Sequence, residues 1–211
     1  MTDRVRADEA GISQAVAVLR DGGLVAFPTD TVYGIGCMAG NAAALEAIFV
    51  AKRRPPEKRV PLLAASLDQA ERRGYRVDER ARRLADRFWP GGLTLVLPSN
   101  SNAKGDGDGD GSGESQAFRV PDHPVALALI ERAGPLATSS ANRSGEPETY
   151  EADDVAVAFA DSDLLDVLLD GGAVPGGVAS SVLDLSVEPA RLVREGAIGR
   201  VQLEAVIGPI D

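Results

Sequence analysis

Short hydroxyl side chains follow several apolar runs of the sequence, at the points where those runs end. Thr29 and Thr31 come directly after the apolar run 24–27, and pairs of serines follow later runs. Positively charged side chains stand near the same places. Hydroxyls and guanidinium groups bind phosphate or carboxylate oxygens, and Arg can do so with two parallel hydrogen bonds. The pattern predicts a site for a polyanion such as a nucleotide triphosphate. Its residues are Thr29, Thr31, Ser139, Ser140, Ser180 and Ser181, with the cations Lys52, Arg54, Lys58, Arg119 and Arg194.

Each of these features also has a plain structural explanation. The segment 29–31 would suit a polar turn after a strand, and the segment 52–59 would suit a solvated run of charges. For any single cation the structural explanation is the better one. The joint placement of the whole set leaves the two explanations about equally supported.

Residues for other kinds of chemistry are scarce in the chain. His123 is the sole histidine, so there is no second imidazole to bind a metal and no obvious Ser–His–Asp triad. Its place before Pro124 favours a role at a helix start. Cys37 is the sole cysteine, which excludes an internal disulfide and favours a buried thiol. The sequence contains neither a P-loop nor a Gly-x-Gly-x-x-Gly segment.

One segment, 99–116, is rich in Gly and Asp. The spacing of Asp106, Asp108 and Asp110 imitates a calcium-binding loop, but Ala117 stands where that loop requires a bidentate Glu. The composition is typical of a flexible, acidic and solvated loop, which is the prediction for this segment.

Length and charge limit the class of protein. The 211 residues suffice for one substantial core, and one domain over 1–211 is predicted. The formal net charge of −10 argues against a protein whose whole surface binds nucleic acid, because phosphate binding needs positive charge. The N-terminus lacks the apolar core of a signal peptide, and no run approaches membrane-spanning length. We therefore expect a cytoplasmic protein without membrane contact.

Strand and helix patterns alternate along the chain and must position the polar residues. They predict a single α/β domain with a mixed, mostly parallel sheet flanked by helices. Gly34 and Gly36 are expected to let the backbone turn sharply or approach a ligand. Strands are predicted over 24–27, 61–65, 93–97, 117–120, 136–138, 167–169, 180–185 and 192–194. Helices are predicted from Asp8 to about 20, from Asn41 to about 52, from Ser66, and over 77–88, 125–132, 153–159 and 201–207.

An ordered set of short motifs resembles the YrdC-like family, whose members include the threonylcarbamoyl-AMP synthases. The first is Phe-Pro-Thr-Asp-Thr-Val-Tyr-Gly at 27–34. Each motif is weak alone, but their order is specific and spans about 22–199. The chain resembles the single-domain form, since it ends too early for the additional C-terminal domain of some members. The other motifs are Ala-Lys-Arg-Arg-Pro at 51–55, Phe-Trp-Pro-Gly-Gly-Leu-Thr at 88–94, Phe-Arg-Val-Pro at 118–121, Ser-Ala-Asn-Arg-Ser-Gly at 140–145, Asp-Gly-Gly at 170–172, Ser-Ser-Val at 180–182 and Arg-Glu-Gly at 194–196.

The resemblance implies a twisted sheet with a concave ligand groove and a nucleotidyltransferase activity. The implied reaction converts L-threonine, bicarbonate and ATP into threonylcarbamoyl-AMP and pyrophosphate. The product would feed a tRNA modification beside the anticodon, through a separate transferase complex and with at most a weak direct contact to tRNA. Mg²⁺ is expected with the triphosphate, held mainly by phosphates and water. The resemblance implies no catalytic side chain.

Carried over by position, the resemblance divides the site residues into two groups. Arg119 would pair with the carboxylate of threonine, and Arg54, Lys58 and Arg194 would contact the nucleotide phosphates. The threonine group is Thr31, Leu63, Arg119, Ser140 and Ser180. The ATP group is Lys52, Arg54, Lys58, Ser115, Asn142, Tyr150 and Arg194.

The sequence departs from the family pattern at four positions. Ser181 stands where Thr is usual, and Arg59 replaces a frequent proline. Leu63 stands where many members have a polar residue, often His, and Tyr150 falls where Thr is usual near the nucleotide. The last two leave open whether side chain or backbone makes the contact there.

Two other functions stay open at this stage. The first is an RNA-binding YrdC-like module whose RNA groove is lined by Lys52, Arg53, Arg54, Lys58 and Arg59. The overall acidity and scarce aromatics weigh against base stacking there. The second is a paralogue with the same fold that acts on another carbamoyl compound. An assay of ATP-dependent pyrophosphate release, with and without threonine, separates the synthase from the RNA-binding module. Replacing threonine with serine or other amino acids in that assay tests for the paralogue.

Overall fold

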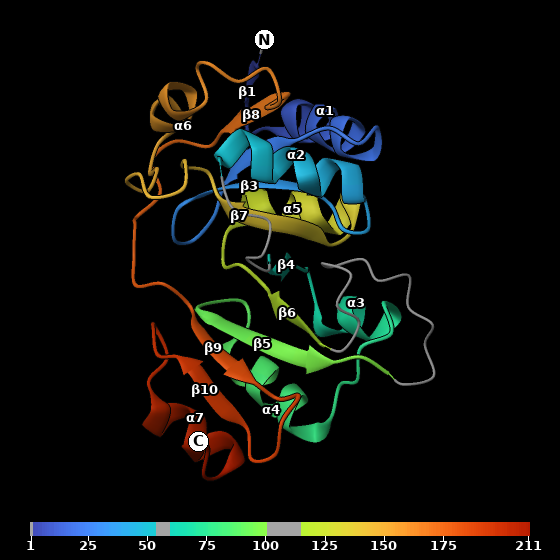
Figure 1. The fold of residues 1–211 in the computed structure, drawn as a ribbon, viewed down its shortest axis with the longest axis vertical. Helices are drawn as coiled ribbons and strands as arrows, with labels where there is room; N and C mark the ends of the chain where they lie inside the picture. Colours follow the sequence, from blue (N-terminus) through green and yellow to red (C-terminus); the bar gives the residue numbers. More distant parts are fainter. Residues whose placement is uncertain (1, 54–59, 101–114) are drawn as a thin grey trace.

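The computed structural model describes residues 2–53, 60–100 and 115–211. Arg54, Lys58 and most of the predicted acidic loop 99–116 lie outside the described residues. The ribbon is elongated, and the two chain ends lie at opposite ends of its long axis (Figure 1).

A single ten-stranded sheet contains all the strands of the described residues, in the order β1-β8-β2-β3-β7-β4-β6-β5-β9-β10. The strands are β1 (Asp3–Arg6), β2 (Val25–Pro28), β3 (Tyr33–Met38), β4 (Leu62–Leu63), β5 (Leu93–Pro98), β6 (Ser115–Arg119), β7 (Leu136–Ser140), β8 (Val167–Asp170), β9 (Ser181–Asp184) and β10 (Arg191–Arg194). The helices are α1 (Glu9–Arg20), α2 (Ala42–Lys52), α3 (Leu67–Arg72), α4 (Glu79–Phe88), α5 (Pro124–Ala133), α6 (Ala152–Ala158) and α7 (Arg200–Ile207).

The predicted mixed α/β architecture is confirmed, but the expectation of mostly parallel strands is wrong. Among the described strands, four neighbouring pairs are parallel and five are antiparallel. A parallel neighbour needs a long crossover connection, whereas the segment 29–32 between β2 and β3 is only a tight turn. The chain therefore folds back on itself there as a hairpin.

Strand β3 was not predicted, because its glycines looked like turn residues. Gly34 and Gly36 instead lie within the strand, opposite Ser140 and Thr138 of β7. A Cβ atom on Gly34 would lie 2.9 Å from Cγ2 of Thr138, and one on Gly36 would lie 3.0 Å from its Oγ1. The two glycines thus make room for the Thr138 side chain between neighbouring strands.

Side-chain caps fix the starts of several helices. The Asp8 carboxylate accepts a hydrogen bond from the Gly11 N–H at 3.0 Å, and the Asn41 side chain accepts one from the Ala44 N–H. The expected role of His123 at a helix start is confirmed, because its Nδ1 accepts from the N–H of Val125 at 3.3 Å. No helix within the described residues is both long enough and apolar enough to cross a membrane.

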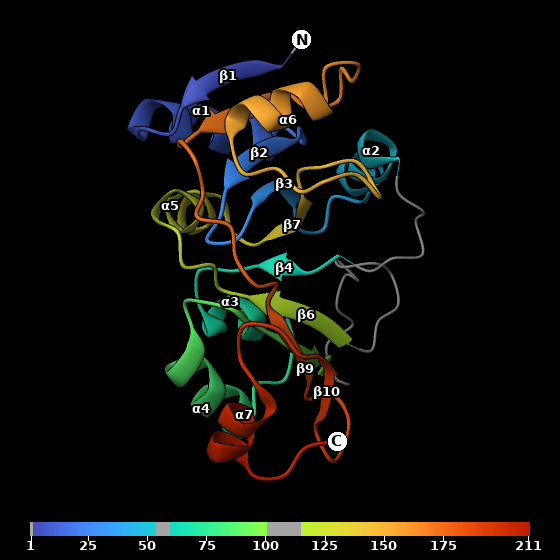
Figure 2. The same cartoon turned by 90° about the vertical axis from the view of Figure 1, so that its left-hand side faces the viewer.

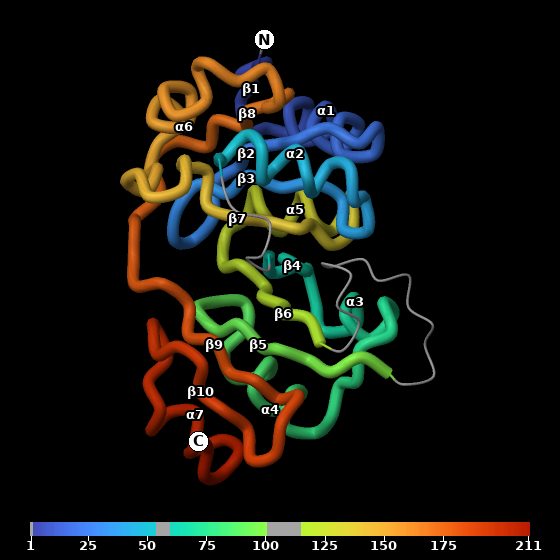
Figure 3. Tube along the Cα trace, in the orientation of Figure 1, coloured from blue at the N-terminus to red at the C-terminus, as the bar shows by residue number. Residues whose placement is uncertain are grey.

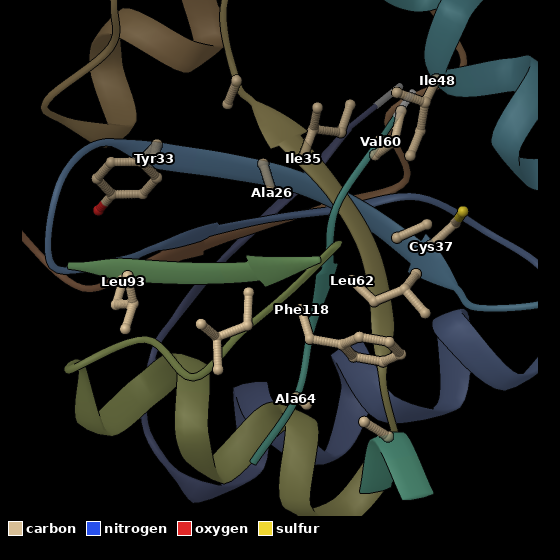
Figure 4. Packing of buried hydrophobic residues seen from close by; sticks show 14 of the residues in the cluster. Ala26, Tyr33, Ile35, Cys37, Ile48, Val60, Leu62, Ala64, Leu93 and Phe118 are labelled. Atoms are coloured by element: carbon tan, nitrogen blue, oxygen red, sulfur yellow. The ribbon is translucent and has the colours of Figure 1, made fainter. Parts of the chain in front are cut away.

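The central strands have apolar side chains on both faces. Val25 and Phe27 pack into a core with α1 and α5, while Ala26 belongs to a second core that includes residues of α2. Figure 2 shows α1 and α5 on one side of these strands and α2 on the other. The second core continues along the sheet to Leu62, on β4, and is drawn in Figure 4.

Cys37 lies within this second core. The prediction of a buried thiol is confirmed, and burial raises the pKa of the Cys37 thiol to about 12. The thiol is therefore protonated at neutral pH and packs as a small apolar group.

Candidate functional site

A cleft of about 270 Å³ lies where the turn after β2, the strands β4, β6 and β7, and the chain around β9 and β10 come together. Figure 3 shows the chain passing from β8 in one half of the molecule to β9 in the other. The volume lies just below the range of about 300–1,000 Å³ that is usual for small-molecule sites. The lining residues are Thr29, Thr31, Val32, Gly34, Leu63, Arg119, Thr138, Ser139, Ser140, Glu148, Gly177, Ala179, Ser180 and Arg194.

Strand alternation explains why Leu63 and Arg119 face the cleft. Their neighbours Leu62 and Phe118 are fully buried in the second core, so the next side chain on each strand points to the opposite face. The register then places Leu63 directly opposite Arg119. Two adjacent strands thus supply one apolar and one charged side chain to the same wall.

The turn between β2 and β3 is organised by the hydroxyl of Thr29. Its Oγ1 donates to the carbonyl oxygen of Val32 at 2.6 Å and accepts from the N–H of Thr31 at 3.3 Å. The hydroxyl oxygens of Thr29 and Thr31 are 3.2 Å apart. A hydroxyl that bonds the backbone a few residues further on holds a turn in one shape. The turn thereby presents Thr31 at the cleft.

Arg119 is held in place from two sides. Its Nε donates to the carbonyl oxygen of Gly91 at 2.9 Å, and its Nη2 donates to Oδ2 of Asp30. The side chains of Arg119 and Asp30 are only 11% and 17% exposed, so the ion pair is partly shielded from solvent. His123 is near enough for electrostatic contact with Asp30: burial lowers the pKa of His123, and the negative charge of Asp30 opposes that shift. The guanidinium group is therefore a preorganised cation at the cleft wall.

Arg194 approaches the cleft from β10. Its Nε and Nη2 both donate to the carbonyl oxygen of Ser180, at 3.0 and 2.8 Å, and Nη2 also lies 3.2 Å from the Ser180 hydroxyl oxygen. The Ser180 hydroxyl is in addition 2.9 Å from that of Thr94 on β5. Ser180 is consequently fixed through both its backbone and its side chain.

Lys52 and Asn142 stabilise the loop that follows β7. The buried ammonium group of Lys52 donates to the carbonyl oxygens of Ser140 and Asn142. The Asn142 amide donates to the carbonyl oxygen of Glu146 at 2.7 Å. These bonds set the position of Ser140, which lines the cleft.

The structure brings together at one cleft six of the twelve residues that the family resemblance assigned to the threonine and ATP groups. Tyr150 is 40% exposed, and its hydroxyl donates to Glu148 at 3.1 Å, while Ser115 lies at the start of β6. Within the described residues, the lining of the cleft does not include Tyr150, Ser115, Lys52 or Asn142. The assignment of these four residues to ATP stays a prediction. The six at the cleft are Thr31, Leu63, Arg119, Ser140, Ser180 and Arg194, and the cleft is also lined by Thr29 and Ser139, which the polyanion pattern predicted.

Sequence reasoning assigned no role to Asp30, Thr94, Thr138 or Glu148. The alternation around Leu93 and Leu95 would have placed Thr94 on the polar face of its strand, so that signal existed. Glu148 lies in no recognised motif, and only the tertiary structure brings it to the cleft. In the described parts of the chain, no three His, Cys, Asp or Glu side chains converge in a way that could hold a metal ion.

Comparisons with known proteins match nearly the whole chain. A family model described as telomere recombination, for Sua5, YciO and YrdC proteins, matches residues 17–196. The chain is 42% identical over 211 residues to a threonylcarbamoyl-AMP synthase of Bacillus subtilis, covering 100% of this chain and 60% of that protein. It is 41% identical to a threonylcarbamoyl-AMP synthase of Pyrococcus abyssi, covering 98% and 60% respectively.

A solved structure agrees with these matches. The structure of Pyrococcus abyssi Sua5 complexed with L-threonine superimposes with a TM-score of 0.84 at 40% identity, covering 100% of this chain and 61% of that chain. The resemblance to the YrdC-like family is thereby confirmed. The chain spans about 60% of the length of these relatives.

Proposed function

The chain belongs to the Sua5/YciO/YrdC family, and from that premise we propose that it is a threonylcarbamoyl-AMP synthase. The proposed reaction takes L-threonine, bicarbonate and ATP to threonylcarbamoyl-AMP and pyrophosphate. The observation that carries the proposal is the gathering of Thr31, Arg119 and Ser180 around one small cleft. The threonine complex of the Pyrococcus abyssi relative supports the choice of amino acid.

The chemistry of the cleft suits a small hydroxylated amino acid. The planar guanidinium of Arg119 matches a carboxylate, and the hydroxyls of Thr31 and Ser180 match a β-hydroxyl group. Leu63 supplies an apolar contact for a methyl group. In this proposal Ser140, whose backbone is fixed by Lys52, completes the amino-acid side of the cleft.

The proposed chemistry needs positioning and neutralisation of charge more than a protein nucleophile. The unprotonated amine of threonine combines with bicarbonate to form a carbamate with loss of one water molecule. A carbamate oxygen then attacks the α-phosphorus of ATP, a P–O bond forms, and the bond to pyrophosphate breaks. Fixed cations and hydroxyls lower the barrier of such a displacement. Arg194 is the cation of the described cleft that we assign to the phosphates.

The rest of the nucleotide site is proposed from sequence position. Lys52, Arg54, Lys58, Ser115, Asn142 and Tyr150 complete it, and Mg²⁺ enters with the triphosphate, bound mainly by phosphate and water oxygens. The product would pass to a separate transferase complex that modifies tRNA, with at most a weak direct contact between this chain and tRNA.

A pyrophosphate-release assay on the full chain tests the proposal. We expect release that requires L-threonine, bicarbonate and ATP together. Serine should be a poor substrate, because losing one methyl contact costs about 1–3 kcal/mol. Valine should be worse, because it leaves the polar groups of the site unpaired. Equal release with valine would refute recognition of the hydroxyl.

The same assay separates the other two functions. Pyrophosphate release that does not depend on amino acids but depends on another carbamoyl compound would indicate the paralogue. An absence of ATP turnover, together with salt-dependent binding of an RNA oligonucleotide, would indicate an RNA-binding module.

A further inference from the structure

Thr94 has a buried hydroxyl group that touches the cleft only through Ser180. It lies on β5 between Leu93 and Leu95, which are both fully buried in the second core, so its side chain points to the opposite face of the sheet. Thr94 is 5% exposed and, within the described residues, is not part of the cleft lining. Its Oγ1 is 2.9 Å from Oγ of Ser180, which does line the cleft.

The direction of these hydrogen bonds follows from counting donors and acceptors. A hydroxyl group has one proton to donate and two lone pairs to accept with. Arg194 can only donate, so its Nη2, 3.2 Å from Ser180 Oγ, occupies one lone pair of Ser180. A buried hydroxyl donates its proton where an acceptor is in reach. Among the described residues, the partner found for Thr94 Oγ1 is Ser180 Oγ, so Thr94 donates to the second lone pair.

Ser180 is thereby left with one hydrogen-bonding function, its own O–H group. Both lone pairs are occupied from the protein side, by Arg194 and Thr94. The proton is then free to point into the cleft that Ser180 lines. A group that can only donate accepts no hydrogen bond from a ligand and requires an acceptor oxygen there.

We propose that Thr94 is a positioning residue that makes Ser180 a hydrogen-bond donor toward the ligand, and so selects an acceptor oxygen at that point of the cleft. This inference rests on the proposed function, in which the acceptor is the β-hydroxyl oxygen of L-threonine. Thr94 touches no substrate and acts through Ser180 alone.

The backbone of Ser180 is held independently of Thr94. Arg194 donates two hydrogen bonds to the Ser180 carbonyl oxygen, at 3.0 and 2.8 Å. Removing the Thr94 hydroxyl therefore leaves Ser180 in place. Only the orientation of the Ser180 O–H group is no longer fixed. The resulting defect should be specific to the amino acid and should spare ATP.

The first test is Thr94→Val, which keeps the branched shape and removes the hydroxyl. Steady-state pyrophosphate release by the full chain would give KM for threonine, KM for ATP and kcat. Loss of one neutral hydrogen bond corresponds to about a 3- to 10-fold effect, so threonine KM should rise by that factor. The preference for threonine over valine should fall by the same factor, and KM for ATP should stay within about twofold. Thr94→Ser, which retains the hydroxyl, should restore threonine KM.

A double-mutant cycle with Ser180→Ala tests whether Thr94 acts through Ser180. In the Ser180→Ala background, adding Thr94→Val should change threonine KM by less than about twofold, because the group being oriented is gone. Thermal unfolding of each variant shows whether it is folded. If Thr94→Val does not fold, Thr94→Ala takes its place in the cycle.

Wild-type threonine KM in Thr94→Val would overturn the inference, and so would an equal rise in the KM for ATP. A full effect of Thr94→Val in the Ser180→Ala background would also overturn it. Calorimetric titration of L-threonine into the wild-type and variant chains separates this failure from failure of the proposed function. A chain that binds threonine, with weaker binding in Thr94→Val, would support the inference even without turnover. A wild-type chain that binds no threonine would overturn both.

Discussion

Two arginines, Arg119 beside the cleft and Arg143 in the loop after β7, are similarly buried but bind different parts of the molecule. Arg143 donates from Nε to the carbonyl oxygen of Ala158, from Nη1 to that of Ala51, and from Nη2 to Asp161. Arg119 donates from Nε to a single carbonyl oxygen, that of Gly91, and from Nη2 to Asp30. The side chain of Arg119 is 11% exposed and that of Arg143 is 9% exposed.

The difference shows that burial and charge do not separate a binding arginine from a structural one. Ala51 and Ala158 lie in the last turns of α2 and α6, where backbone carbonyls lack helical partners. Arg143 donates a hydrogen bond to each of these two carbonyl oxygens, and all three of its guanidinium nitrogens are bonded within the protein. At Arg119 the hydrogen bonds of the described residues use two nitrogens, and the side chain lines a cleft. The number of donors left for a ligand is the useful distinction.

The largest effect should come from Arg143→Ala. The substitution leaves two carbonyl groups at helix ends without their donor. Each carbonyl that stays buried without a hydrogen bond lowers the stability by about 1–3 kcal/mol. We expect the free energy of unfolding to fall by about 2–4 kcal/mol in urea denaturation. Folded protein should keep its KM for threonine. Unchanged stability would show that water replaces the guanidinium at the ends of both helices.

Arg119→Ala should have the opposite profile. Losing a charge-assisted contact with the carboxylate costs about 1.5–3 kcal/mol, so threonine KM should rise by about 10- to 150-fold, with a smaller change for ATP. Arg119→Lys is the matched control: it keeps the charge but not the planar fork, and should recover only part of the loss. A normal threonine KM in Arg119→Ala would remove Arg119 from the amino-acid site.

Asp161→Asn should change little, although Asp161 is the acidic partner of Arg143. The Asp161 side chain is 61% exposed, and pairs of that kind contribute about 0–1 kcal/mol. Urea denaturation of the single variant would measure the change. A loss as large as that of Arg143→Ala would mean that the ion pair, and not the two carbonyl contacts, stabilises this region.

The smallest effect should be on the pH dependence of stability. It involves His123, which interacts electrostatically with Asp30, the ion-pair partner of Arg119. Burial lowers the pKa of His123, while the charges of Asp30 and Asp122 oppose the shift. As pH falls below about 6.5, the unfolded chain binds a proton at this position before the folded chain does. Stability from His123 is therefore complete above that pH and is lost as pH falls toward the lower folded pKa.

His123→Asn tests this effect, because Asn also caps helix starts but does not titrate in this range. The free energy of unfolding of the variant should vary less between pH 5 and 6.5 than that of the wild type. Identical slopes would show that the imidazole makes no contribution to the pH dependence.

Features of the fold that depend on nearby residues could be predicted from the sequence. Asp8 and Asn41 mark helix starts by a contact three residues along the chain, so the sequence contains the whole interaction. Strands β1 and β3 were missed because distant partners stabilise them. The β1 residues, Asp3–Arg6, are mostly polar and pair with β8, and the glycines of β3 make sense only beside Thr138.

The same limit applies to the candidate site. Thr31, Arg119 and Ser180 were predicted because each belongs to a recognisable motif, and the cleft brings them together. The sequence could not show that the ammonium group of Lys52 faces two backbone carbonyls, because those carbonyls lie about 90 residues away. The contact between Thr94 and Ser180 spans 86 residues and was invisible for the same reason.

The position of β8 between β1 and β2 has a consequence during synthesis. The N–H of Leu24, just before β2, bonds to Asp166 across 142 residues. One edge of β2 therefore stays unpaired on the ribosome until residues 167–170 have emerged. The strand carries the apolar side chains of Val25 and Phe27. At about 5–20 residues per second, that interval is on the order of ten seconds. An open apolar strand edge can pair with other chains, so the nascent protein should depend on a chaperone more than its finished fold suggests.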